Sequence, residues 1–145
     1  MNLSTNLFGA KINHTRFVSA SLAIFIPLIA LVLAGCSPAS QPGPVDAIEA
    51  YQDALVAGDV EQLVNASCAD WEAQARLELD SFTAVTTELV DRSCEEAGQD
   101  GDTTLVACTG IIKANYGAEV LEINLADRMV QAVYEGGEWR MCGYR

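Results

Sequence analysis

A charge-free apolar segment near the start of the chain constrains its fold more than any other feature. Phe17–Leu33 holds no charged residue and follows a polar stretch that carries Lys11 and Arg16. A positive flank before an apolar run is typical of an export signal. The run is interrupted by Pro27, and its roughly 17 residues are short for a permanent membrane helix, which needs about 20. We therefore expect this region to direct export rather than join the fold.

The four residues that close this segment indicate the type of signal. Leu33-Ala34-Gly35-Cys36 resembles the lipobox of bacterial lipoprotein precursors. Small residues before Cys36 let the peptide bond reach a signal peptidase, and the Cys36 thiol is the acceptor for lipid. The resemblance implies cleavage before Cys36 and a lipid anchor on Cys36, at the extracytoplasmic face of the cell membrane or outer membrane. An uncleaved transmembrane anchor is the alternative.

The chain after the signal divides into a tether and one domain. Ser37–Pro44 holds three prolines, a glycine and two serines, a composition that favours an extended linker. We expect residues 1–35 to be a signal peptide, 36–44 the lipidated cysteine and tether, and 45–145 the folded domain. Cleavage leaves 110 of the 145 residues, enough for one small core but not for a second domain.

Charge and residue types exclude several functions. All 20 acidic residues follow Cys36, against six basic ones, so the mature formal charge is −14. Such a surface repels phosphate backbones, and we expect no nucleic-acid partner. The single histidine, His14, lies in the signal, which excludes Ser-His-Asp and Cys-His catalysis and histidine metal sites. No Cys-x-x-Cys pair occurs, and we expect neither a metal nor a cofactor.

The domain separates into a helical half and a strand half. Proline and acid at Pro44 and Asp46 mark a helix start, and Gly58 marks its left-handed end. Gly136 and Gly137 form a two-residue hairpin turn. We expect three helices, at Pro44–Gly58, Asp59–Ala66 and Asp70–Phe82. The strands follow at Val85–Val90, which leads towards Cys94, and at Thr103–Ile112, Val120–Leu125, Met129–Tyr134 and Trp139–Tyr144. The third and fourth strands are open to being one long strand. The order predicts an α+β fold with N-terminal helices on an antiparallel meander sheet.

Two stretches of the domain resemble the nuclear transport factor 2-like (cystatin-like) family. Ala47–Leu63, a helix, a Gly-Asp break and a second helix, is similar to the opening of such domains. Gly136–Gly143 is similar to their closing strand. The resemblance implies a curved sheet wrapped around a long helix, with a pocket between them. Some members are ketosteroid isomerases or polyketide cyclases, and many small lipoproteins of this build have no known activity.

No catalytic motif of these enzymes can be carried over to the sequence. An isomerase-like pocket needs a general base and an oxyanion donor. The candidate bases are Asp53, Asp91 and Asp127, and the candidate donors are Tyr51, Tyr116, Tyr134 and Trp139. With 20 acids in the domain, such neighbours are expected by chance. The sequence therefore favours a non-catalytic module that binds an unknown small molecule or protein, with a pocket enzyme of the ketosteroid-isomerase or polyketide-cyclase type as the alternative. A buried acid beside a tyrosine, in a cavity of about 300 Å³ or more, would favour the enzyme.

Two short motifs have structural interpretations. Tyr134 and Trp139 flank the Gly136-Gly137 turn symmetrically and should face each other across the hairpin. We interpret this pair as core packing rather than ligand stacking. The Asp100-Gly101-Asp102 turn supplies too few ligands for calcium, and we interpret it as a hairpin loop.

Four cysteines remain after the lipidated one: Cys68, Cys94, Cys108 and Cys142. An exported small domain favours two disulfides, and four cysteines allow three pairings. A three-residue loop at 100–102 would pair Gln99 with Thr103 and place Cys94 opposite Cys108, close enough for a bridge.

This register would place Val90 on the same apolar face as Cys94, Val106, Cys108 and Ile112. We therefore favour Cys94–Cys108 with Cys68–Cys142. The pairing of Cys68 with Cys94 and Cys108 with Cys142, and four free thiols, remain alternatives.

Overall fold

The computed structural model describes residues 41–145. The predicted signal peptide, Cys36 and most of the predicted tether lie outside the described residues. Three helices come first: α1 (Pro44–Ala57), α2 (Val60–Asn65) and α3 (Glu72–Asp80). The Gly43 N–H donates to Asp46 Oδ2 at 2.6 Å where α1 begins, and Gly58, at φ 72°, ends it. The predicted first helix and its caps are thereby confirmed.

The second half of the domain is one antiparallel sheet. Its strands are β1 (Thr86–Asp100), β2 (Thr103–Asn115), β3 (Val120–Asn124), β4 (Val130–Glu135) and β5 (Glu138–Tyr144). The hydrogen-bonded order is β1-β2-β4-β5, and β3 pairs with the other half of β2. The short 3₁₀ helix η1 (Leu125–Asp127) separates β3 from β4. The open question of one long strand or two is thus answered in favour of two.

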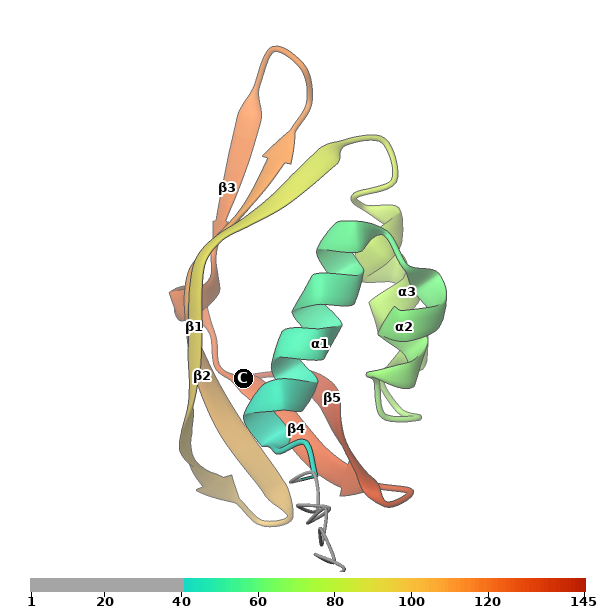
Figure 1. Ribbon diagram of the computed structural model, residues 1–145, viewed down its shortest axis with the longest axis vertical. Helices are drawn as coiled ribbons and strands as arrows, with labels where there is room; N and C mark the ends of the chain where they lie inside the picture. The colour runs from blue at the N-terminus through green and yellow to red at the C-terminus, as the bar shows by residue number, and fades with distance from the viewer. Residues whose placement is uncertain (1–40) are drawn as a thin grey trace, which may run out of the picture. The chain divides into compact units, whose positions relative to one another are not determined.

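The sheet curves around the first helix. In Figure 1, α1 lies on the concave side of the sheet, and α2 and α3 lie on the opposite side of α1. Helix α1 contacts β1, β2, β4 and β5 as well as α2. This arrangement confirms the α+β class, with helices on one face of a curved antiparallel sheet that does not close.

The core fills the space between α1 and the sheet. Ile48, Tyr51 and Leu55 of α1 are almost fully buried, as is Met141 of β5. Gln52 interrupts this apolar face but is also buried, with its Nε2 donating to Cys108 Sγ at 3.5 Å. Its polar group therefore has a partner, as a buried amide requires.

A bulge bends β1 at its middle. Asp91 has φ 52° there, and Gly110 opposite has φ 104°. A Cβ at Gly110 would lie 2.6 Å from the Val90 carbonyl oxygen, so the close approach requires glycine. The bulge reverses which side chains face the core: Leu89 packs on it, and the expectation for Val90 was wrong.

The bulge also directs Arg92 toward α1. Its guanidinium donates to the Glu49 carbonyl oxygen at 2.9 Å and to Asp53 Oδ1 at 2.6 Å. The Arg92 side chain is 18% exposed, whereas its partner Asp53 is 60% exposed, so the ion pair lies at the surface and the bond to the Glu49 carbonyl is the more shielded contact. They attach the long β1–β2 hairpin to the outer side of α1.

Both disulfides have the favoured pairing, Cys94–Cys108 and Cys68–Cys142. The expected three-residue loop, however, was wrong. Asp100 pairs with Thr103, so the turn has two residues, and Gln99 lies opposite Thr104. A second register shift at 97 restores the alignment of the two cysteines. The right pairing therefore came from a register that is correct only between the two bulges, from Ser93 to Glu96.

The Cys68–Cys142 bridge joins the helical layer to the last strand. Next to it, the Cys68 N–H donates to the Met141 carbonyl oxygen at 2.8 Å, and the Met141 N–H donates to Ala66 at 2.8 Å. The segment between α2 and α3 thus pairs with β5 like a short parallel strand, at Ser67 and Met141. This contact fixes the segment that leads into α3 to the last strand.

Candidate functional site

Two hollows in the domain have side chains suited to binding or chemistry. The first, here the inner cavity, lies between α1, α3 and the sheet and has a volume of about 230 Å³. The second, here the hairpin pocket, lies where the start of α1, the end of α2 and the β4–β5 turn meet, and has a volume of about 630 Å³. The two hollows differ in whether their polar groups are bonded to one another or open to solvent.

A cluster of polar and aromatic side chains borders the inner cavity. This Glu78 cluster consists of Tyr51, Trp71, Glu78, Arg128 and Tyr144. The Tyr51 hydroxyl donates to Glu78 Oε2 at 2.5 Å, and the Tyr144 hydroxyl donates to the same oxygen at 3.2 Å. The Trp71 Nε1–H donates to the Tyr51 oxygen at 3.2 Å. Arg128 lies 3.8 Å from Glu78 Oε1 and stacks 3.7 Å from the centre of the Tyr144 ring.

The surroundings keep both tyrosines of the cluster protonated. Burial, followed by the neighbouring Glu78 carboxylate, raises the pKa of Tyr51 and of Tyr144 well above the ordinary tyrosine value of 10. Arg128 opposes the shift of the Tyr144 pKa, as expected for a nearby positive charge. Both hydroxyls are therefore hydrogen-bond donors at any physiological pH.

The Glu78 cluster meets only part of the expectation for an enzyme. A partly buried acid does lie beside two tyrosines. The cavity, at about 230 Å³, is smaller than the range typical of ligand pockets. The Glu78 oxygen that a base would use already accepts two hydroxyl bonds, and the same two hydroxyls are not free for an oxyanion. The arrangement is a closed network that positions α1, α3 and β5.

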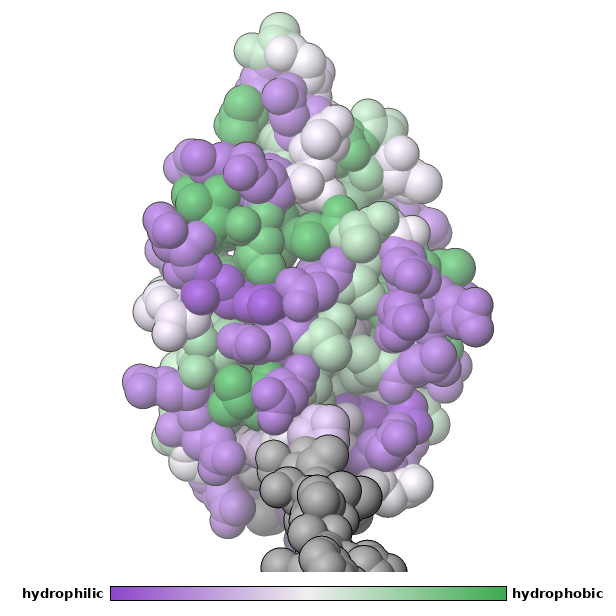
Figure 2. All heavy atoms as spheres, viewed as in Figure 1, coloured by the Kyte–Doolittle hydropathy of each residue, from purple (hydrophilic) through white to green (hydrophobic). Residues whose placement is uncertain are grey.

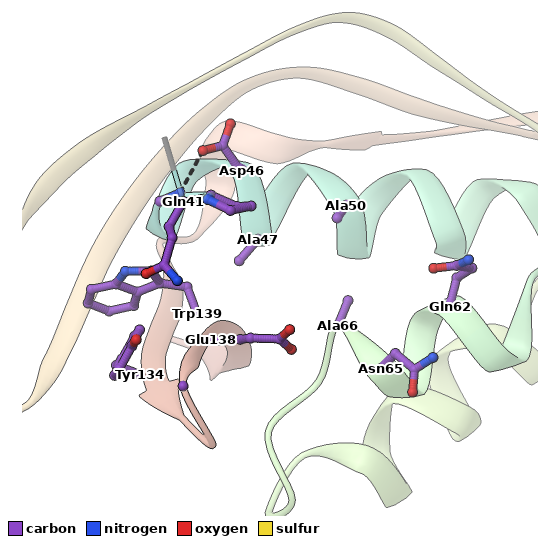
Figure 3. A pocket seen from close by; sticks show the side chains of 13 residues that line it. Gln41, Asp46, Ala47, Ala50, Gln62, Asn65, Ala66, Tyr134, Glu138 and Trp139 are labelled. Carbon is purple, nitrogen blue, oxygen red and sulfur yellow. Dashed lines mark hydrogen bonds between the residues drawn. The ribbon is translucent and has the colours of Figure 1, made fainter. Parts of the chain in front are cut away.

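The hairpin pocket has an aromatic end. Tyr134 and Trp139 are direct partners across the β4–β5 turn, with ring centres 5.5 Å apart and planes at 67°. The predicted cross-hairpin contact is confirmed, but the core role was wrong for Tyr134, which is 56% exposed. Figure 3 shows both rings at one end of the pocket. Trp139 is half-buried, because its other side packs against the core.

The opposite end of the hairpin pocket is polar. Gln62 and Asn65 of α2 lie at that end, and the Glu138 carboxylate lies between them and the rings (Figure 3). Arg140 donates to Glu138 Oε2 at 3.1 Å and to the Asn65 carbonyl oxygen at 2.5 Å. The intervening wall is made of small side chains, Ala47, Ala50 and Ala66.

The other residues that the sequence suggested are not brought together. Asp53 is held by Arg92, Asp91 is exposed at the β1 bulge, and Asp127 is exposed in η1. Tyr116 is 53% exposed at the β2–β3 turn. Asp100 forms an ion pair with Arg145 at the surface, and it closes the two-residue turn between β1 and β2 by pairing with Thr103. No candidate base therefore faces a candidate donor among these residues.

Sequence reasoning missed Glu78, the acid that does meet two tyrosines. It lies three residues after Ala75 and one before Leu79, both buried on the inner face of α3. That spacing places Glu78 at the border of the buried face, and it is the sequence signal that could have identified this residue.

The described surface mixes apolar and polar side chains. Figure 2 shows a group of apolar residues in the upper half of one face, bounded below by a band of hydrophilic ones. Within residues 41–145, no helix is long and apolar enough to cross a membrane. The same part of the chain holds no group of three His, Cys, Asp or Glu suited to a metal ion. Comparison with protein-family models, curated proteins and solved structures finds no match to this chain.

Proposed function

We propose that this chain is a bacterial lipoprotein, anchored through lipid on Cys36, whose nuclear transport factor 2-like domain is a non-catalytic module that binds a ligand in the hairpin pocket. One observation carries the proposal. The hairpin pocket combines a ligand-sized volume of about 630 Å³ with the exposed ring of Tyr134 and the exposed side chains of Gln62, Asn65 and Glu138. The Glu78 cluster, by contrast, uses its hydroxyls internally.

The curved sheet around α1 supports the family assignment. A long first helix on the concave side of an antiparallel sheet is the arrangement that the resemblance implies.

The anchor would place the hairpin pocket close to a membrane. Gln41 and Pro42 line the pocket, and Cys36 precedes Gln41 by five residues. Five extended residues span about 17 Å, so a lipid on Cys36 would hold the pocket near the membrane surface. Metabolic labelling with a radioactive fatty acid tests the anchor: label on the wild-type chain and none on Cys36→Ser is expected. Label that remains on Cys36→Ser would refute it.

A fragment screen tests the binding proposal. Neutral fragments are added to the ¹⁵N-labelled protein, and the indole N–H signals of Trp139 and Trp71 are followed by NMR. We expect fragments that shift the Trp139 signal and leave Trp71 unchanged, and a loss of these shifts in Tyr134→Ala. Tyr116→Ala, which removes an equally exposed tyrosine elsewhere, is the matched control. A screen in which no fragment shifts Trp139 would refute the proposal.

The enzyme alternative rests on Glu78 between two tyrosines and has its own test. A β,γ-unsaturated ketosteroid is incubated with the protein, and the conjugated product is followed by its absorbance. We expect no turnover above that of Glu78→Gln. Turnover that requires Glu78 would show that the closed network opens for catalysis and would overturn the non-catalytic assignment.

A further inference from the structure

We infer that the ligand of the hairpin pocket is a neutral saccharide. The inference rests on the proposed binding function and names the chemical class that the pocket recognises. It follows from three features of the pocket: an open aromatic surface, amide and carboxylate groups opposite it, and the absence of cationic side chains among the described residues of its lining.

The aromatic end offers a surface for the apolar face of a sugar ring. Tyr134 is 56% exposed, so its ring is not committed to the core. The inclined geometry with Trp139, with planes at 67°, forms a corner rather than a stack. Pyranose rings present C–H groups on one face, and these pack against aromatic rings by dispersion and weak C–H contacts. A ligand that packs on this corner keeps its polar edge directed away from the rings.

The polar end matches the hydroxyl groups of such a ligand. The amides of Gln62 and Asn65 each offer donors and an acceptor, and the Glu138 carboxylate offers acceptors. A hydroxyl group both donates and accepts, so it can pair with either kind of group. Arg140 bridges Glu138 and the Asn65 backbone, which restricts the movement of both. A purely apolar ligand would leave these groups without partners, at a cost in affinity.

Charge favours a neutral ligand over an anionic or cationic one. Asp46 and Glu138 are the charged residues of the described lining, and the whole mature domain is strongly acidic. Phosphates and uronic acids are therefore repelled. A cation gains little from Glu138, because the Arg140 guanidinium already balances its charge, while the second Glu138 oxygen keeps its lone pairs for a hydroxyl group. Asp46 accepts from the Gly43 N–H at the start of α1.

The size of the hairpin pocket suits a short oligosaccharide. Its volume of about 630 Å³ lies in the middle of the range for small-molecule sites, enough for a di- or trisaccharide. Its alanine wall leaves the space between the rings and the amides open. Neutral sugar rings with hydroxyl groups are common to a free oligosaccharide and to the end of an envelope polysaccharide, and the pocket fits both.

Titration of the full chain tests the inference, in a detergent that has no sugar headgroup. The neutral probes are chitotriose, cellotriose and maltotriose, the anionic probe is trigalacturonic acid, and the cationic probe is choline. Calorimetry and the indole N–H signal of Trp139 in NMR report binding. Cosedimentation with purified peptidoglycan sacculi, run in parallel, distinguishes an envelope polymer from a free oligosaccharide.

We expect at least one neutral trisaccharide or the sacculi to bind, and trigalacturonic acid and choline not to bind. Tyr134→Ala and Gln62→Ala should each weaken binding about tenfold or more, while Tyr116→Ala stays within about twofold of wild type. Preferred binding of the anion or of choline would overturn the inference. Failure of every saccharide, with fragments still shifting Trp139, would overturn the saccharide class and leave the binding function intact; failure of both would overturn both.

Discussion

The domain contains two edge-to-face aromatic pairs of almost the same geometry and opposite surroundings. Trp71 and Tyr144 lie 5.7 Å apart with planes at 81°, and Tyr134 and Trp139 lie 5.5 Å apart with planes at 67°. The first pair belongs to a network in which hydroxyl, indole and carboxylate groups satisfy one another. The second borders a pocket with an exposed ring.

The difference shows that aromatic contact alone does not identify a binding site. What distinguishes the two pairs is whether the polar groups beside the rings already have partners. Tyr51 at the first pair is 1% exposed and donates to Glu78, whereas Tyr134 at the second is 56% exposed. Disruption of the closed network should therefore cost stability, and disruption of the open pair should cost affinity.

Removal of the Cys68–Cys142 bridge should lower the free energy of unfolding more than any other change. The bridge attaches the segment that carries Trp71 to the strand that carries Tyr144. The sequence separation is 74 residues, and the chain-entropy model gives a loss of about 4.5 kcal/mol in the free energy of unfolding for Cys68→Ala with Cys142→Ala. The shorter Cys94–Cys108 loop, with a separation of 14, gives about 3 kcal/mol. Urea denaturation compares the two double variants. Equal losses, or a larger loss from the shorter loop, would contradict this order.

Replacement of Glu78 by leucine should cause the next largest loss of stability. It leaves the Tyr51 and Tyr144 hydroxyls without their acceptor, and we expect a loss of about 3 kcal/mol from unsatisfied, largely buried donors. Gln74→Leu, an exposed polar position on the same helix, serves as the control and should change stability by less than about 0.5 kcal/mol. If Glu78→Leu were as stable as Gln74→Leu, the network would not be a stabilising unit.

High pH should weaken the closed network. The pKa values of Tyr51 and Tyr144 are raised in the folded state, so their contribution is fully present below pH 10, the unfolded value, and declines above it. The unfolded chain then binds fewer protons than the folded one. Each tyrosine should lower stability by about 1.4 kcal/mol per pH unit above 10. Denaturation at pH 9 to 12 should show a shallower decline in Tyr144→Phe, and an unchanged slope would contradict the assignment.

Truncation of Tyr134 should have the smallest effect on stability. Because the ring is 56% exposed, Tyr134→Ala should cost no more than about 1 kcal/mol of cross-strand contact with Trp139. Thermal unfolding of Tyr134→Ala is compared with that of Tyr144→Ala. The second variant loses a half-buried ring and its hydrogen bond to Glu78, so it should lose more stability. A loss from Tyr134→Ala as large as that from Tyr144→Ala would place Tyr134 in the structural core after all.

Local signals in the sequence predicted the first helix with its ends and the turn between the last two strands. Gly58 and the Gly136-Gly137 turn have the conformations that their residue types favour, with φ values of 72°, 65° and 94°. Helix caps and tight turns depend on residues within about four positions of one another, so the residue types in a short segment specify them. The disulfide pairing followed from strand register, although the loop assumed for it was wrong by one residue.

The sites were decided by tertiary structure. Glu78 meets Tyr51 and Tyr144 because the folded chain brings α3 against α1 and β5, although these residues lie 27 and 66 positions apart in the sequence. The hairpin pocket combines α1, α2 and the β4–β5 turn, none of which borders a pocket alone. The bulge at Asp91 exchanged Val90 for Leu89 on the inner face, which no alternation rule predicts.

The sequence by itself determined the acidic charge of the residues after Cys36, the α+β order and the cysteines available for bridging, because these depend on composition and short spacing. Only the folded chain decided which aromatic pair is closed and which is open. That choice depends on whether polar partners from distant segments arrive within hydrogen-bond distance, and on how much solvent the packing excludes. Both are properties of three-dimensional packing that chain spacing does not encode.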